Sequence, residues 1–163
     1  MTIISLIMFV PHTHKIREIL FRGFPIFKLS YHFIANTRYM EFKIDTKDTF
    51  TIIVPVNGTI DAKLTGEMKA KCAELAQNGT NNFIIDFTNC AEIDKKAIDD
   101  LVTLHEECYA NEQSVVYTGV NRQVLAVLKE NEADLLINLA PTMKEAIDII
   151  SMEILERDLF REE

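Results

Sequence analysis

Two carboxylates and two lysines are the residues of this sequence whose types and spacing could do chemistry. Asp61 follows one predicted strand, Asp94 follows another, and Lys95 and Lys96 come directly after Asp94. In an open α/β sheet the carboxyl ends of the strands form the edge where sites develop, so we expect these side chains to lie there. Two carboxylates beside an amine could exchange protons with a substrate.

The rest of the sequence does not support catalysis. It contains no GxxxxGK[ST] phosphate-binding loop and no GxSxG nucleophile elbow. His105 and Cys108 have i,i+3 spacing, but two ligands are too few for a structural zinc site, and an ordinary helix histidine is the favoured interpretation. Asp61 and Asp94 have an alternative role as helix N-caps. We therefore expect no enzymatic activity, no metal and no cofactor.

The two lysines occupy an unusual place for cations. The apolar residues of 98–104 recur at helical spacing, and "FIIDF" before them is a predicted strand, so Lys95 and Lys96 fall in the first turn of a helix. The N-terminus of a helix carries the positive pole of its dipole and its free N–H groups, and it favours anions or capping hydroxyls. Asp94 fits this position as the N-cap, whereas two adjacent lysines do not.

Composition and charge indicate one soluble globular domain without a nucleic-acid partner. The 163 residues are 48% hydrophobic and 26% charged. Residues 1–39 hold five basic residues and one acidic residue, whereas residues 40–163 hold 12 basic and 24 acidic residues. The acidic body argues against nonspecific nucleic-acid binding and gives no support to adhesion on anionic lipid.

Three widely spaced cysteines, Cys72, Cys90 and Cys108, form no CxxC pair. An odd number without metal-binding spacing indicates reduced, largely buried thiols in a cytoplasmic protein.

Residues 1–39 differ from the rest of the chain in composition. The apolar start, "MTIISLIMFVP", is too short to span a bilayer and lacks the basic region of a signal peptide, so we expect no integral membrane segment. We predict that residues 1–39 are an N-terminal appendage, including the hypothesis that they are translated from a misassigned start, and that residues 40–163 form the domain. A membrane-surface or partner-binding segment is the alternative.

Strand and helix patterns alternate along residues 40–163. Strands are predicted in 41–45, 49–56, 81–87 and 114–120, and a last short strand in 134–140, with helices starting near residues 62, 95, 121 and 142. This order predicts an α/β sandwich with a mixed, largely parallel sheet of about four or five strands and about four helices. Pro55 places its neighbourhood at an edge or bulge. The predicted core comprises Ile52, Val54, Phe83, Ile84, Ile85, Leu101, Leu104, Val115, Val116, Leu125, Leu128 and Ile147.

Three segments together resemble the STAS domain, the fold of bacterial anti-sigma factor antagonists. "VNGTIDA" resembles the family's Gly-x-x-Asp, with Gly58 and Asp61. "FIIDFTNCAEIDKKAIDDL" resembles its strand, loop and Asp-Ser-Ser/Thr-Gly helix start, and the segment from "SVVYTGV" to "TMKEAI" resembles its last two strand–helix units. The resemblance covers roughly residues 41–150 and implies the STAS sandwich.

The resemblance also implies a function and a departure from it. The second Ser/Thr of that motif is normally phosphorylated by a partner kinase that is also the anti-sigma factor. Aligned on Asp94, this position is Lys96, Lys95 takes the first Ser and Ala97 takes the Gly. Lysine has no transferable hydroxyl, so Lys96 is a degenerate phosphosite.

We therefore expect a bacterial signalling protein of transcription regulation that binds a protein partner without the usual phosphoswitch. The partner would be an anti-sigma factor or a kinase-like regulator, bound through Asp61, Asp94, Lys95 and Lys96. Two alternatives remain open, namely an accessory subunit of a lipid or anion transport system and a STAS protein that binds a small molecule.

Overall fold

The computed structural model describes residues 42–56 and 58–161, and its centre is a strand buried on both faces. This strand, β4 (Asn82–Asp86), contains the apolar run Phe83, Ile84 and Ile85, all with no exposed surface. A continuous apolar run is typical of a strand that is covered on both sides. The predicted appendage, residues 1–39, lies outside the described residues and stays a prediction.

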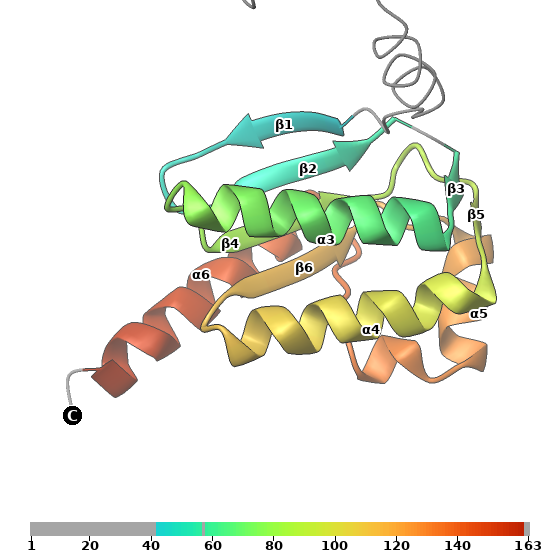
Figure 1. Cartoon of the computed structure of the whole chain (residues 1–163). Coiled ribbons are helices and arrows are strands. Elements are labelled where there is room, and N and C mark those ends of the chain that lie inside the picture. Colours follow the sequence, from blue (N-terminus) through green and yellow to red (C-terminus); the bar gives the residue numbers. More distant parts are fainter. Residues whose placement is uncertain (1–41, 57, 162–163) are drawn as a thin grey trace, which may run out of the picture. The chain divides into compact units, whose positions relative to one another are not determined.

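The sheet has four strands in the order β1-β2-β4-β6 (Figure 1). Strand β4 pairs in parallel with β2 (Thr51–Pro55) on one side and with β6 (Ser114–Thr118) on the other. The edge strand β1 (Phe42–Thr46) pairs antiparallel with β2. A second, two-stranded parallel sheet joins β3 (Thr59–Ile60) to β5 (Glu92–Ile93). The predicted mixed, largely parallel sheet is confirmed.

Within residues 42–56 and 58–161, four α-helices cover the sheet, and each starts within one residue of its predicted position. They are α3 (Ala62–Gln77), α4 (Lys95–Ala110), α5 (Arg122–Glu130) and α6 (Met143–Arg161). Helices α3 and α4 lie on one face of the sheet and α6 lies on the other (Figure 1). The described residues therefore form the predicted α/β sandwich, built in three layers.

The core consists of two clusters, one on each face. The larger cluster packs α3, α4 and α5 against the sheet and includes Leu64, Met68, Leu101 and Tyr117. The smaller cluster packs α6 against the other face, with five buried residues: Ile84, Val116, Ala140, Ala146 and Ile150. Among the described helices, α3, α4 and α5 thus pack in the cluster on one face of the sheet, and α6 packs on the other face.

The two faces of the sheet differ in how many helices pack on them, and this difference explains why two predicted core residues of β2 are only half-buried. In β2, Ile53 is fully buried, as is Thr51, whereas the predicted Ile52 and Val54 are half-buried. Alternate residues of a strand point to opposite faces. Ile53 packs in the larger cluster and Ile52 against the smaller one, to which α6 is the only helix of the described residues that contributes.

Two other predicted core residues, Leu125 and Ile147, are also half-buried. The remaining predicted core is buried: Phe83, Ile84, Ile85, Leu101, Leu104, Val115, Val116 and Leu128.

Two local predictions also need correction. Pro55 ends an internal strand, not an edge strand; parallel pairing of β2 with β4 spans only Thr51–Ile53, so the missing N–H of Pro55 breaks no bond there. The segment predicted as a last strand forms a 3-10 helix, η2 (Ala133–Leu135), and then a single parallel bridge between Leu139 and Tyr117. The N–H of Tyr117 donates to the carbonyl of Asn138 at 2.8 Å.

Within the part of the chain that the structure describes, none of the helices has the length and apolar character needed to cross a membrane.

Leu101→Ala tests the packing of α4 on the sheet. Leu101 is 1% exposed, and removing its side chain should lower the free energy of unfolding by about 2–5 kcal/mol because it leaves a cavity in the larger cluster. Leu135→Ala, at a leucine that is 79% exposed, is the matched control and should change stability by less than about 0.5 kcal/mol. Urea denaturation measures both. Equal costs for the two variants would contradict the packing described.

Candidate functional site

Parallel pairing of β3 with β5 places Asp61 and Asp94 in neighbouring positions. Ile60 and Ile93 are register partners, and each aspartate is the residue that follows its strand. The N–H of Asp94 donates to the carbonyl of Ile60 at 2.9 Å, which holds the two segments together. The helices α3 and α4 start directly after these residues and their first turns lie at the same end of the sandwich (Figure 1).

The two aspartates occupy equivalent places but differ in what their side chains do. Asp61 is the N-cap of α3, and its Oδ1 accepts a hydrogen bond from the N–H of Leu64 at 2.8 Å. Asp94 is the N-cap of α4 but makes no side-chain capping bond, and it is exposed. The capping interpretation therefore accounts for Asp61 and leaves the Asp94 carboxylate available at the surface.

Lys95 and Lys96 are the first two residues of α4, as predicted, and both are exposed. The first turn of this helix holds no acidic residue. Among the residues that the structure describes, no ion pair within 4.0 Å joins either lysine to Asp61 or Asp94. A cation at a helix N-terminus is unfavourable by the dipole argument, so the stability of α4 does not explain these lysines.

Asn121 holds the loop before β5 against the start of α5, a role that the sequence analysis missed. Its Oδ1 accepts from the N–H of Val124 at 2.9 Å, and its Nδ2 donates to the carbonyls of Cys90 and Ala91 at 3.1 and 2.9 Å. The preference of asparagine for N-caps could have indicated the first bond. The second and third depend on packing between segments about 30 residues apart.

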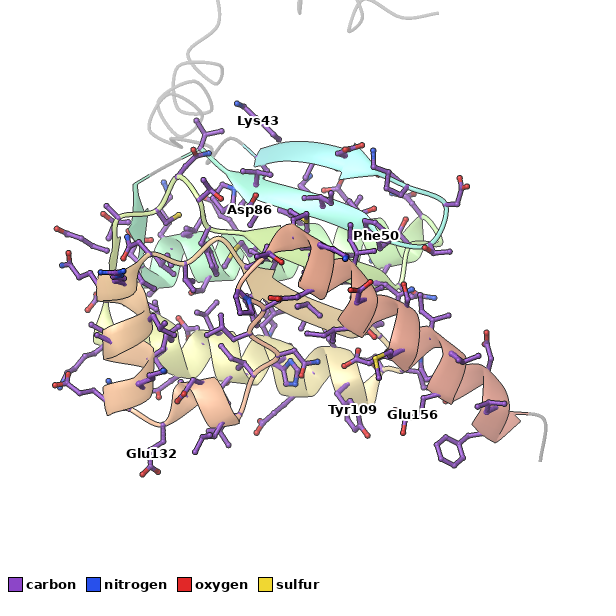
Figure 2. The ribbon with its side chains drawn as sticks, turned by 180° about the vertical axis from the view of Figure 1, so that it is seen from behind. Lys43, Phe50, Asp86, Tyr109, Glu132 and Glu156 are labelled. Atoms are coloured by element: carbon purple, nitrogen blue, oxygen red, sulfur yellow. The ribbon has the colours of Figure 1, made fainter. Side chains whose placement is uncertain are left out.

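Gly119 also fixes this loop and was not predicted as a site residue. Its φ of 72° lies in the left-handed region, and a Cβ there would meet Asp86 and Thr88 closer than real Cβ atoms approach any neighbour. Asp86, labelled in Figure 2, accepts at Oδ1 from the N–H and the hydroxyl of Thr88, at 2.9 and 2.5 Å. The backbone of Gly119 therefore lies directly against this bonded pair.

Burial raises the pKa of the Cys90 thiol to about 11, and the nearby Asp86 carboxylate adds to the rise. The thiol is therefore neutral at physiological pH and is a poor nucleophile. The described residues contain no group of three or more His, Cys, Asp or Glu that could hold a metal ion. This edge of the sheet presents exposed charged groups on loops held by hydrogen bonds, an arrangement suited to recognition.

Comparisons with known proteins agree on one fold. The family profile described as the STAS domain matches residues 41–146. The structure of the anti-sigma factor antagonist SpoIIAA in its unphosphorylated form is 17% identical with a TM-score of 0.54, covering 68% of this chain and 96% of that chain. A variant of RsbS from Moorella thermoacetica is 18% identical with a TM-score of 0.57, covering 72% of this chain and 98% of that chain.

An anion transporter also has a matching region. The murine anion transporter Slc26a9 in its inward-facing state is 12% identical with a TM-score of 0.54, and the match covers 78% of this chain but 24% of the transporter. No curated protein sequence matches the chain. At these identities the structural matches show a shared fold.

Gly119→Ala tests how closely Gly119, the residue after β6, approaches the loop that contains Thr88. The new Cβ would meet Asp86 and Thr88 and occupy a strained φ, so we expect a loss of about 1–3 kcal/mol or more in the free energy of unfolding. Gly66→Ala, in α3 where the new Cβ would meet nothing within 4 Å beyond its chain neighbours and the backbone of its own helix, is the control and should raise stability by about 0.4–1 kcal/mol. Thermal and urea denaturation measure both. If both variants raised stability, or both lowered it, the close approach at Gly119 described above would be contradicted.

Proposed function

Because this chain belongs to the STAS domain family, we propose that it is a non-enzymatic module that binds a protein partner through Asp61, Asp94, Lys95 and Lys96. One observation carries the proposal. The pairing of β3 with β5 brings Asp61 and Asp94 to neighbouring positions, and Asp94, Lys95 and Lys96 are exposed there. Such charges contribute little to stability, so recognition is the better account of them.

The proposed partner is an anti-sigma factor or a kinase-like regulator. SpoIIAA, whose structure matches this chain, is an anti-sigma factor antagonist, and the match covers nearly all of its length. We propose the same class of partner for this chain, in the cytoplasm of a bacterium.

We propose further that phosphorylation does not control binding at this turn. A phosphoserine adds a charge of about −1.5 to −2, which a helix N-terminus favours. Lys96 carries the opposite charge and offers no hydroxyl to a kinase. Partner binding through this turn would then be constitutive.

An accessory role in an anion transport system is the second candidate, supported by the structural match to the transporter Slc26a9. The two candidates differ in the partner that the chain would retain. A soluble regulator supports the first, and a membrane transport protein supports the second.

Affinity capture with matched variants tests the proposed surface. The tagged chain is incubated with lysate of its source organism that includes the membrane fraction, and retained proteins are identified by mass spectrometry. Lys95→Glu/Lys96→Glu should lose the specific partner because the exposed charges reverse sign. Lys129→Glu, at an exposed lysine at the end of α5, is the control and should retain it. A partner that both variants retain equally would show that another surface binds it.

Lys96→Ser tests whether a lysine in the first turn of α4 destabilises the helix and prevents phosphorylation there. Removing a cation from a helix N-terminus should raise the free energy of unfolding by about 0.3–1 kcal/mol. Lys129→Ser should lower it by a similar amount, because Lys129 lies in the last turn of α5 where a cation is favourable. Incubation with the retained kinase-like partner and labelled ATP adds a second measurement. Phosphate on the parent chain at Thr88 or another hydroxyl of this loop would refute the loss of the switch.

A further inference from the structure

The second half of α6 exposes large apolar side chains that no other part of residues 42–56 and 58–161 covers. Met152, Leu155, Leu159 and Phe160 are 70%, 61%, 60% and 71% exposed. Figure 1 shows α6 running behind the sheet with its last turns extending past it, toward the C-terminus. The buried residues of this helix, Ala146 and Ile150, belong to its first half. Contiguous exposed apolar surface on one element is typical of a binding surface.

The exposed residues follow helical spacing, so they form one face. Met152, Leu155 and Leu159 stand at i, i+3 and i+7, and together with Glu156 and Phe160 they line a shallow groove along the helix. This is the spacing by which two amphipathic helices anchor on each other. We call this surface, lined by Met152, Leu155, Glu156, Leu159 and Phe160, the α6 face.

Hydrogen bonds on the opposite side of the helix keep the α6 face turned outward. The Arg157 guanidinium donates from Nη1 to Ser114 Oγ at 2.6 Å and from Nη2 to Asn82 Oδ1 at 2.5 Å. Asn138 Nδ2 donates to Glu153 Oε1 at 2.5 Å. Arg157 is therefore engaged with the sheet, and it does not offer its charge to a partner on the outer side.

The same bonds place the α6 face far from the proposed site. Asn82 and Ser114 are the first residues of β4 and β6, whereas Lys95 and Lys96 lie beyond the opposite, carboxyl ends of the strands. The surface proposed to bind a regulator therefore does not include the α6 face.

The charges around the α6 face select the kind of occupant. Glu156 lies within the groove, and Asp148 and Asp158 are exposed on the same helix (Figure 2 labels Glu156). If a second copy packed face to face, the groove would bring Glu156 near Glu156 inside an apolar contact, and like charges there are costly. A helix with lysine or arginine beside its apolar stripe would instead pair with these carboxylates.

We propose that the α6 face is a docking site for an amphipathic helix of a protein partner whose apolar stripe is flanked by basic residues. The apolar side chains supply the contact area, and Glu156, Asp148 and Asp158 set the charge that the partner must carry. The site is independent of the surface that contains Lys96.

The experiment uses the full chain and a defined probe. The probe is a fluorescently labelled helical peptide of about 18 residues made of leucine and lysine, with leucines on one face at i, i+3, i+4 and i+7. A second peptide has the same composition with the leucines distributed around the helix. Fluorescence anisotropy at physiological salt measures both dissociation constants.

The parent chain should bind the amphipathic peptide at least tenfold more tightly than Leu155→Ser/Leu159→Ser does. Glu156→Lys should also weaken binding several-fold. Leu135→Ser/Leu136→Ser removes two other exposed leucines, 79% and 57% exposed, and should bind as the parent does. Lys95→Glu/Lys96→Glu should bind as the parent does as well, which separates this proposal from the proposed function. Unfolding curves of all variants confirm that they are folded.

Two results would overturn the proposal. Equal affinity of the parent and Leu155→Ser/Leu159→Ser, or of the two peptides, would show that general charge attraction accounts for binding. A parent dimer in sedimentation equilibrium that Leu155→Ser/Leu159→Ser dissociates would assign the α6 face to a second copy of this chain.

Discussion

The parallel pairing of β4 on both of its sides is the constraint on which the other features depend. Because β2, β4 and β6 run in one direction, their carboxyl ends lie at a single edge of the sheet, and the loops that follow must all turn there. Those loops have to pass one another closely, which is why Gly119 lies against Asp86 and Thr88. The short pairing of β3 with β5 then extends the parallel arrangement beyond the sheet and sets the starts of α3 and α4 side by side.

Lys95 and Lys96, at the start of α4, lower the stability of the folded domain only slightly. An unfavourable charge at a helix N-terminus amounts to about 0.3–1 kcal/mol, whereas a buried residue such as Leu101 contributes several times more. The packing of α4 is therefore sufficient to keep the helix in place whatever its first turn carries. The fold therefore places little demand on the residues of that turn, which is consistent with the recognition role that we propose for Lys95 and Lys96.

Elements with many apolar residues at regular spacing could be predicted from the sequence. Features that depend on contacts between distant segments of the chain could not. Helix starts and strand β4 follow from periodicity and from the run Phe83–Ile85. The two-residue strands β3 and β5 are too short to have a period. In β2, Ile52, Ile53 and Val54 are all apolar, so alternation could not say which face is better covered. The positions of Asp94, Lys95 and Lys96 were predictable, whereas the bonds from Asn121 to the loop were not.

The placement of the two proposed surfaces at opposite ends of the strands has an electrostatic consequence. A strand of five residues such as β4 spans about 17 Å, and the Debye length at physiological ionic strength is about 8 Å. Exposed charges separated by that distance are largely screened from one another. Under the two proposals, Lys95 and Lys96 would therefore not set the charge of a partner at Glu156, and each surface would select its own partner by local charge and shape. A module of this size could then join two proteins, with binding free energies that add because no side chain belongs to both surfaces.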